Sequence, residues 1–168
     1  MGNEYPLAFP HVNQPVFFLG EAELEAGRVA SRKSPRLRIT LPLHRELGDG
    51  VQRMINFLQP GTYITPHHHP AVGFSETIFV IHGRILFVEF ASTGQVLMKR
   101  LLTGGTPEAL VDFGGTLIHT FICLDPDTVI LEIKKGPYAG PEDKVFAPWA
   151  PPEGDPASAG YMANLLNK

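Results

Sequence analysis

Three consecutive histidines between two prolines are the strongest chemical signal in the sequence. They lie in the segment PGTYITPHHHP, residues 60–70. Side chains alternate along an extended strand, so His67 and His69 project to one side and His68 projects to the other. The two imidazoles then start about 6–7 Å apart at the backbone. From that spacing both rings can reach one metal ion at roughly 2.0–2.1 Å per nitrogen.

Two further side chains could complete a metal site with this pair. Glu76 follows His69 by seven residues at the start of an apolar run, and His119 lies inside the run LIHTFICL. The apolar neighbours Ile118 and Phe121 indicate an interior strand, where an imidazole without a partner would be costly. Three imidazoles and one carboxylate suit one divalent transition metal, for which Fe, Mn, Ni and Zn are the candidates.

The same residues also have ordinary structural interpretations. A histidine-rich turn between prolines can be a solvated loop, and Glu76 can be a surface charge at a strand end. His119 can equally be a hydrogen-bonded core histidine. A histidine pair on one strand face also occurs by chance. Composition and spacing alone leave the metal site and these alternatives open.

Length and composition bound the fold that must position these residues. The chain has 168 residues, of which 43% are hydrophobic and 18% are charged. Those values suit one domain with its own core and argue against a long solvated helical bundle. Glycine and proline are frequent, with 17 and 16 residues and no repeating period. This excess predicts many turns between short strands.

The charge balance and the apolar runs restrict the partners. Lys and Arg number 14 against 17 Asp and Glu, which gives a net charge of -3. This balance does not indicate a nucleic acid or an anionic membrane as partner. No apolar run approaches the roughly 20 residues of a membrane-spanning helix. The single cysteine, Cys123, excludes an intramolecular disulfide and is expected to be a buried, inert thiol. We therefore expect a cytoplasmic protein.

Short runs rich in β-forming residues fill the middle of the chain. Turn sequences such as PG, HG, STG and GG separate them, a pattern typical of an antiparallel sandwich or barrel. We therefore expect a β-barrel domain over residues 37–135. The runs cover residues 51–58, 76–81, 84–90, 95–102, 109–113, 117–124 and 128–133.

The N-terminal part, residues 1–36, has a different composition. It begins with an extended arm that contains prolines and phenylalanines, and we expect this arm to favour a homodimer by packing or strand exchange. Residues 21–33 predict one helix, with acidic residues at its start and basic residues at its end, as the helix dipole favours. We interpret the basic cluster that follows as a solvated helix end, with an anion-binding edge as the alternative. That cluster consists of Arg28, Arg32, Lys33, Arg36 and Arg38.

The C-terminal part, residues 136–168, is again rich in proline and glycine. Three aromatic residues interrupt it, whereas a pure linker would have none. We expect an irregular segment that wraps around the barrel and that these aromatic residues hold in place. Tyr138, Phe146 and Trp149 should then be at least partly buried.

The glycines around the histidines complete a known pattern. Gly61 stands six residues before His67, and Gly83 stands seven residues after Glu76. The segment GTYITPHHHPAVGFSETIFVIHG resembles the first motif of the cupin superfamily, G-x5-H-x-H-x3,4-E-x6-G. The resemblance implies an all-β, single-domain cupin, which is an antiparallel jelly-roll β-barrel, here with a short N-terminal helix. It also implies a metal site made by His67, His69, Glu76 and His119.

The chain departs from the cupin pattern in two places. Six residues, rather than three or four, separate His69 from Glu76, which we interpret as a two-residue loop insertion within residues 71–74. The second motif, G-x5-P-x-G-x2-H-x3-N, keeps only His119, although a Gly-Gly pair can still form its turn. The positions of its Pro, Gly and Asn are occupied by Gly114, Thr116 and Cys123.

Longer segments narrow the resemblance. SPRLRITLPLH (34–44), VQRMINFLQPGTYITPHHHP (51–70) and KKGPYAGPEDKVFAPWAPPEG (134–154) are similar to the cupin-fold metalloproteins of the WbuC type. The tail segment ending DKVFAPWAP is the most specific part. That family takes its name from O-antigen polysaccharide gene clusters, and the resemblance implies a metal-binding cupin without implying a substrate.

Four protein ligands leave one or two open positions on a five- or six-coordinate ion. A substrate oxygen or dioxygen could be polarised there. We therefore expect a mononuclear divalent-metal cupin that acts on or binds a small polar molecule, with sugars and sugar derivatives among the candidates. Oxygenase and isomerase-like reactions are both open. The alternative is a non-catalytic module that binds a small ligand, and a purely structural metal is a third interpretation.

Three polar residues are candidates for the mouth of the pocket. Arg53, Asn56 and Tyr63 lie on or near strands that lead to the histidine pair. Each also has an ordinary interpretation. Arg53 can extend along the surface with its charge in water, Asn56 can cap a bulge, and Tyr63 can belong to the core.

Overall fold

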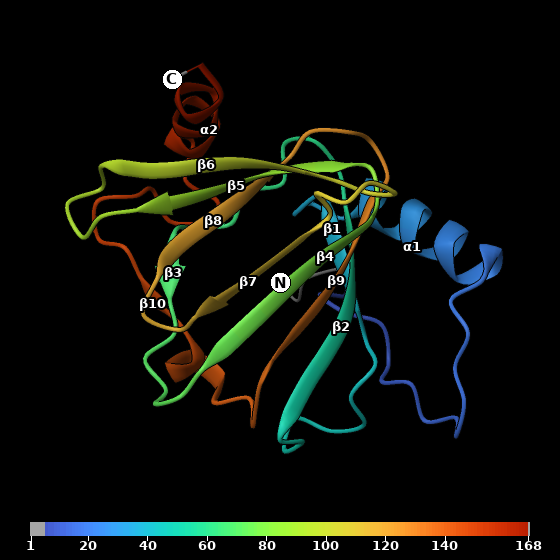
Figure 1. Ribbon diagram of the computed structural model, residues 1–168. Helices are drawn as coiled ribbons and strands as arrows, with labels where there is room; N and C mark the ends of the chain where they lie inside the picture. Colours follow the sequence, from blue (N-terminus) through green and yellow to red (C-terminus); the bar gives the residue numbers. More distant parts are fainter. Residues whose placement is uncertain (1–5, 168) are drawn as a thin grey trace.

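Two five-stranded antiparallel sheets face one another in the computed structural model, which describes residues 6–167 (Figure 1). This arrangement confirms the predicted antiparallel jelly-roll barrel. The first sheet has the order β1 (Arg38–Pro42), β2 (Val51–Leu58), β9 (Thr128–Lys135), β4 (Ser75–His82) and β7 (Leu110–Gly114). The second has the order β10 (Val145–Phe146), β3 (His67–His68), β8 (Ile118–Cys123), β5 (Arg84–Phe90) and β6 (Val96–Thr103).

The predicted elements coincide closely with the observed ones. Helix α1 (Glu21–Lys33) and strands β2 and β5 have the predicted bounds, and the other five predicted runs differ by one or two residues at an end. Strands β3 and β10 have two residues each. Such short pairings carry no alternating pattern, because they depend on which segments the fold brings together.

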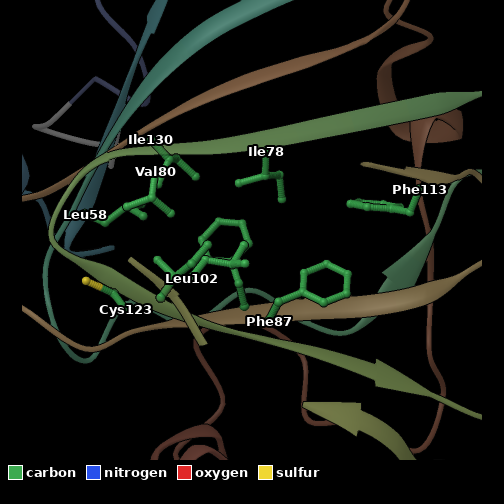
Figure 2. Packing of buried hydrophobic residues seen from close by; sticks show 10 residues of the cluster. Leu58, Ile78, Val80, Phe87, Leu102, Phe113, Cys123 and Ile130 are labelled. Atoms are coloured by element: carbon green, nitrogen blue, oxygen red, sulfur yellow. The ribbon is translucent and has the colours of Figure 1, made fainter. Parts of the chain in front are cut away.

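An apolar cluster from both sheets fills one end of the barrel interior (Figure 2). Ile78 and Val80 of β4 face Phe87 of β5, and all three are fully buried. Cys123 lies in the same cluster, so its expected burial is confirmed, and burial raises the pKa of its thiol to about 11. This cluster leaves the other end of the interior to polar side chains.

Helix α1 covers the outer face of the first sheet. Its first turn is capped by the Glu23 carboxylate, which accepts a hydrogen bond of 3.0 Å from the Gly20 backbone N–H. Gly27 lies directly against the ring of Phe57, so that a Cβ at this position would come within 2.3 Å of the ring. The helix can approach the sheet this closely only because residue 27 has no side chain.

The N-terminal arm packs against the first strand of its own chain. Ala8 forms a parallel bridge with Thr40, and the Phe9 N–H donates a hydrogen bond of 2.8 Å to the Thr40 carbonyl. Phe9 also joins the apolar cluster between α1 and the first sheet. Residues 1–5 of the predicted N-terminal segment lie outside the described residues.

Of the three aromatic residues predicted to hold the C-terminal segment, Trp149 is the most buried. Its ring centroid lies 5.1 Å from that of Phe90, and its Nε1–H donates a hydrogen bond of 2.9 Å to the Ser92 carbonyl. Tyr138 and Phe146 are 43% and 56% exposed, so they are only partly buried, and the ring centroid of Phe146 lies 6.1 Å from that of His67. Backbone hydrogen bonds to the barrel, and small buried residues such as Ala147, also fix the segment there.

The tail also contains helix α2 (Ala157–Asn167), which was predicted to be irregular. Leu165 and Tyr161 attach this helix to the outer face of the second sheet, beside β5 and β6 (Figure 1). The helix depends on this tertiary contact, because its sequence has no strong amphipathic pattern. Within residues 6–167, neither α1 nor α2 has the length and hydropathy that a membrane-crossing helix requires.

Two glycine substitutions test the contact between α1 and the sheet. We expect Gly27→Ala to destabilise the protein by about 1–3 kcal/mol, since the added methyl group overlaps the Phe57 ring. Gly160→Ala in α2 is the matched control, because a Cβ there meets nothing within 4 Å. Its effect should be neutral or stabilising by up to about 1 kcal/mol. Urea unfolding gives the free energy of unfolding of each variant. Equal changes in the two variants would contradict a close contact between Gly27 and Phe57.

Candidate metal centre

Three histidines converge at the polar end of the barrel interior. His67 on β3 is paired directly with His119 on β8, and His69 follows immediately after β3. The three side chains are 1–3% exposed. Their candidate ligand nitrogens all lie within 4.8 Å of one another. The predicted alternation is also correct, since His68 on the opposite side of the strand is only half-buried. A cluster of this geometry suits a metal ion.

Each imidazole is oriented by a backbone carbonyl. The Nδ1 atoms of His67, His69 and His119 lie 2.9, 2.6 and 3.1 Å from the carbonyl oxygens of Thr65, Asp143 and Leu117. A carbonyl oxygen can only accept, so Nδ1 carries the proton in all three rings. Each neutral ring therefore presents an unprotonated Nε2. In metal-binding histidines, a hydrogen bond from the ring nitrogen that does not bind the metal fixes the tautomer in this way.

Glu76 on β4 completes the cluster from the facing sheet. Its Oε2 atom lies 3.0 Å from Nε2 of His69 and 3.8 Å from Nε2 of His119. Oε2 of Glu76 and Nε2 of His69 are buried and lack a hydrogen-bond partner among the described residues. With both imidazole and carboxylate unprotonated, two acceptors face each other in a low-dielectric site. Such a contact is stable only with a cation, either a proton or a metal ion, at this point.

The electrostatics of the cluster favour the forms that ligate a metal. Burial lowers the pKa of His67 well below its usual value and lowers that of His119 to about 4. Burial alone would raise the pKa of Glu76, but the close contact with the His69 ring and the charge of nearby groups, Lys144 among them, lower it to about 2. At neutral pH His67 and His119 are therefore neutral and Glu76 is ionised. These are the protonation states that metal ligands need.

Glycines hold the loops that deliver these side chains. Gly61 and Gly83, at the two ends of the first motif, have φ angles of 94° and 79°, as turns with left-handed backbone require. Gly115 lies beside the histidines, where a Cβ would come within 2.8 Å of the His69 carbonyl oxygen. The His69 N–H donates a hydrogen bond of 2.7 Å to the Gly115 carbonyl. The Gly-Gly turn thus seats the loop that carries His69.

The predicted loop insertion within residues 71–74 contributes a wall to the site. Phe74 is buried, and its ring stacks on that of His69 with centroids 3.9 Å apart and planes 9° apart. Glu76 still reaches His69 Nε2, because the insertion is accommodated in a turn before β4 begins. The Glu76 carboxylate therefore stays at the cluster despite the longer spacing between His69 and Glu76.

The C-terminal segment closes the site, which the sequence analysis did not anticipate. The short 3-10 helix η1 (Gly140–Asp143) places the Asp143 carbonyl on His69, and β10 then pairs with β3 beside His67. Asp143 and Lys144 belong to the tail segment DKVFAPWAP. That specific segment was the only signal that could have indicated their role.

A charged cavity of about 160 Å³ lies in the polar half of the barrel. Four basic residues and one acidic residue are among those that line it: Arg36, Arg38, Lys134, Lys144 and Glu132. Glu132 of β9 accepts a hydrogen bond of 2.9 Å from the Asn56 side chain, and burial together with the charge of Glu76 raises its pKa. Lys144 is close enough to the histidine cluster to influence its charge, because its ammonium group helps to lower the pKa of Glu76. The cavity and the cluster therefore share one electrostatic environment.

The three candidate pocket residues have different positions. Asn56 lines the cavity, as proposed. Arg53 is exposed on the outer face, because it differs from Asn56 by an odd number of positions along β2 and so projects to the opposite side. Tyr63 is buried, and its hydroxyl donates a hydrogen bond of 2.7 Å to the Pro151 carbonyl. It holds the C-terminal segment and does not line the cavity, so the pocket assignment was wrong for Arg53 and Tyr63.

Comparison with known proteins places the chain in a family without an established role. The family model described as "Domain of unknown function (DUF6016)" matches residues 19–102. No protein with a curated function matches the sequence.

Solved structures with a similar fold include several proteins of different activity. The capsular polysaccharide assembling protein CapF from Staphylococcus aureus is 20% identical with a TM-score of 0.50, over 59% of this chain and 27% of that chain. A recombinant oxalate oxidase in complex with glycolate is 18% identical with a TM-score of 0.50, over 69% of this chain and 58% of that chain. The cupin_2 domain of an XRE-family transcriptional regulator from Enterobacter cloacae is 18% identical with a TM-score of 0.46, over 60% of this chain and 97% of that chain.

These likenesses concern the fold. The chain spans 27% of CapF and 58% of the oxalate oxidase, so it corresponds to only part of each. The two likenesses with a TM-score of 0.50, together with the two facing antiparallel sheets and the motif glycines at their turns, show that this protein has the cupin fold.

The histidine environment predicts a pH-dependent stability of the metal-free protein. The pKa of His119 is about 4 in the folded state and about 6.5 as a model value, so the unfolded chain binds more protons between these values. Stability should therefore fall as the pH falls, by about 2 kcal/mol from His119 alone between about pH 7.5 and about pH 5. Urea unfolding after removal of metal with a chelator measures this change. His119→Gln should flatten the dependence, and an equally steep dependence in that variant would contradict the assignment.

Proposed function

The chain belongs to the DUF6016 family of unknown function, and from this premise and the buried cluster we propose that it is a mononuclear divalent-metal-binding cupin that acts on a small polar molecule. One observation carries the proposal. The Nε2 atom of His69 and the Oε2 atom of Glu76 are buried, lack a hydrogen-bond partner among the described residues and lie 3.0 Å apart. A protein interior does not keep two such acceptors together without a cation.

The proposed ligands are the three imidazoles and the carboxylate. His67, His69 and His119 bind through Nε2, because Nδ1 of each is engaged by a carbonyl. Glu76 binds through its carboxylate, and its charge offsets part of the charge of a divalent ion. Fe, Mn, Ni and Zn all accept this donor set. When bound, such an ion supplies a Lewis acid that can polarise an oxygen of the substrate.

Other side chains of this protein would prepare the substrate. Burial and the charge of Glu76 raise the pKa of the Glu132 carboxyl at the cavity wall, and Asn56 fixes its orientation. Phe74 excludes water from one face of His69. A polar molecule in the cavity would thus meet a proton donor or acceptor close to the metal, as oxygenase and isomerase-like reactions both require.

The alternative function is a non-catalytic module that binds a small ligand. One observation favours it, namely that most charged groups of the cavity are already held in ion pairs. Arg36 and Arg38 pair with Glu153, and Lys134 pairs with Asp143. Such a wall is preorganised for binding. Turnover assays with candidate substrates separate the two functions, since a binding module returns every ligand unchanged.

The proposal also covers a more specific family relationship, the cellular location and the oligomeric state. The tail segment DKVFAPWAP supports a relationship to the WbuC-type metalloproteins. A sugar or sugar derivative is proposed separately as the small polar molecule. A homodimer in the cytoplasm is proposed as well. It is supported by the N-terminal arm, where Val16 and Phe18 leave 65% and 81% of their surface exposed.

Metal analysis of purified variants tests the proposal. We expect about one divalent ion per chain in protein that is purified without added metal and without a histidine tag. The His67→Ala/His69→Ala double variant should retain almost none, and His119→Ala and Glu76→Ala should each lower the content. His68→Ala is the matched control, because this residue lies on the same strand and projects to the opposite side. Elemental analysis by mass spectrometry gives the metal content.

Two results would change the assignment. Full metal retention in the double variant would overturn the proposed site. Full retention in Glu76→Ala, with loss in the histidine variants, would remove the carboxylate from the ligands and leave a three-histidine site.

A further inference from the structure

Lys144 differs from the other charged residues around the cavity. It lines the cavity from the segment between η1 and β10, and its side chain is partly accessible there. Within residues 6–167 its ammonium group has no hydrogen bond and no ion pair, and it interacts with Glu132, Lys134, Glu76 and Asp143 only at longer range. An ammonium group inside a barrel is costly without a close partner.

Each neighbouring basic residue has an acidic partner close by. Arg38 lies 2.6 Å and Arg36 lies 2.7 Å from the Glu153 carboxylate, so the two guanidinium groups share one acidic partner. Lys134 lies 2.7 Å from Oδ2 of Asp143, and both of these side chains are buried. Lys144 is therefore the basic residue of the cavity that lacks a carboxylate of its own.

Two guanidinium groups on one carboxylate leave this part of the wall with excess positive charge. Even with Glu132 counted as ionised, the four basic residues of the cavity face only three carboxylates, those of Glu132, Asp143 and Glu153. The cavity therefore carries positive charge that the chain itself does not neutralise.

The position of Lys144 relates this charge to the histidine cluster. Its ammonium group acts on His67, His119 and Glu76, whose pKa values it helps to lower. The cavity of about 160 Å³ is smaller than the pockets of about 300–1,000 Å³ that hold drug-sized ligands. The cavity therefore admits only a small molecule beside Lys144.

We propose that the cavity binds a small carboxylate, with the carboxylate group of the ligand on Lys144 and its other polar end toward the histidine cluster. This inference rests on the proposed function, since it names the chemical class of the molecule that this site receives. A carboxylate supplies the single negative charge that Lys144 lacks. A neutral ligand would leave the ammonium group unpaired, and a phosphate dianion would bring a second negative charge toward Glu76 and Glu132.

Binding of a matched pair of probes tests the inference. Lactate and lactamide have nearly the same size and differ in charge, and isothermal titration calorimetry of the metal-loaded protein measures their affinities. We expect lactate to bind at millimolar concentration and lactamide to bind at least about tenfold more weakly, because charge-assisted hydrogen bonds exceed neutral ones. Inorganic phosphate, the third probe, should also bind more weakly than lactate.

Two lysine variants locate the binding group. Lys144→Met should weaken lactate binding by about tenfold or more and leave the metal content unchanged. Lys33→Met removes the same charge from the exposed end of α1 and should change neither. Thermal stability of Lys144→Met should equal or exceed that of the wild type, because the variant removes an unpaired ammonium group from the barrel. That readout separates lost binding from lost folding.

The outcomes distinguish this inference from the proposed function. Equal lactate affinity in the wild type and Lys144→Met, or tighter binding of lactamide or phosphate than of lactate, would overturn the carboxylate assignment. So would the absence of lactate binding to the metal-loaded wild type. A wild type that neither contains nor takes up a divalent metal would instead overturn the proposed function, and this is measured before any probe is added.

Discussion

The contact between Nε2 of His69 and Oε2 of Glu76 is the constraint on which the polar half of the barrel depends. The two atoms lie 3.0 Å apart, both are buried, and neither has a hydrogen-bond partner among the described residues. The contact is unfavourable without a cation, so the surrounding structure must hold it in place. Carbonyl groups fix the Nδ1 side of each imidazole, and Phe74 covers one face of His69.

The barrel can sustain this contact because its interior is divided. Ile78, Val80 and Phe87 form a close-packed apolar end, which contributes the hydrophobic burial of the domain. On β4 and β9, the inward positions change from apolar to charged within one or two alternations, from Ile78 to Glu76 and from Ile130 to Glu132. One end of each strand thus contributes mainly to stability, and the other end carries the chemistry.

The C-terminal segment is part of the site as well as a covering of the barrel. It provides the carbonyl that orients His69, the carboxylate that pairs with Lys134, and Lys144 itself. Strand β10 then fixes this segment beside β3. Because these contacts join residues about 75 positions apart in the chain, folding of the barrel and completion of the site depend on each other.

The sequence by itself determined seven of the strands, helix α1 and the four residues of the cluster. Period-two patterns and turn glycines are local, and the spacing of His67 and His69 sets their common side wherever the strand lies. Only the tertiary structure decided which other groups meet there. Arg53 faces outward and Asn56 faces the cavity because of their parity on β2, and Lys144 reaches the interior through a two-residue pairing. Helix α2 likewise forms on a contact with the second sheet. Such contacts depend on distant segments, and no local pattern encodes them.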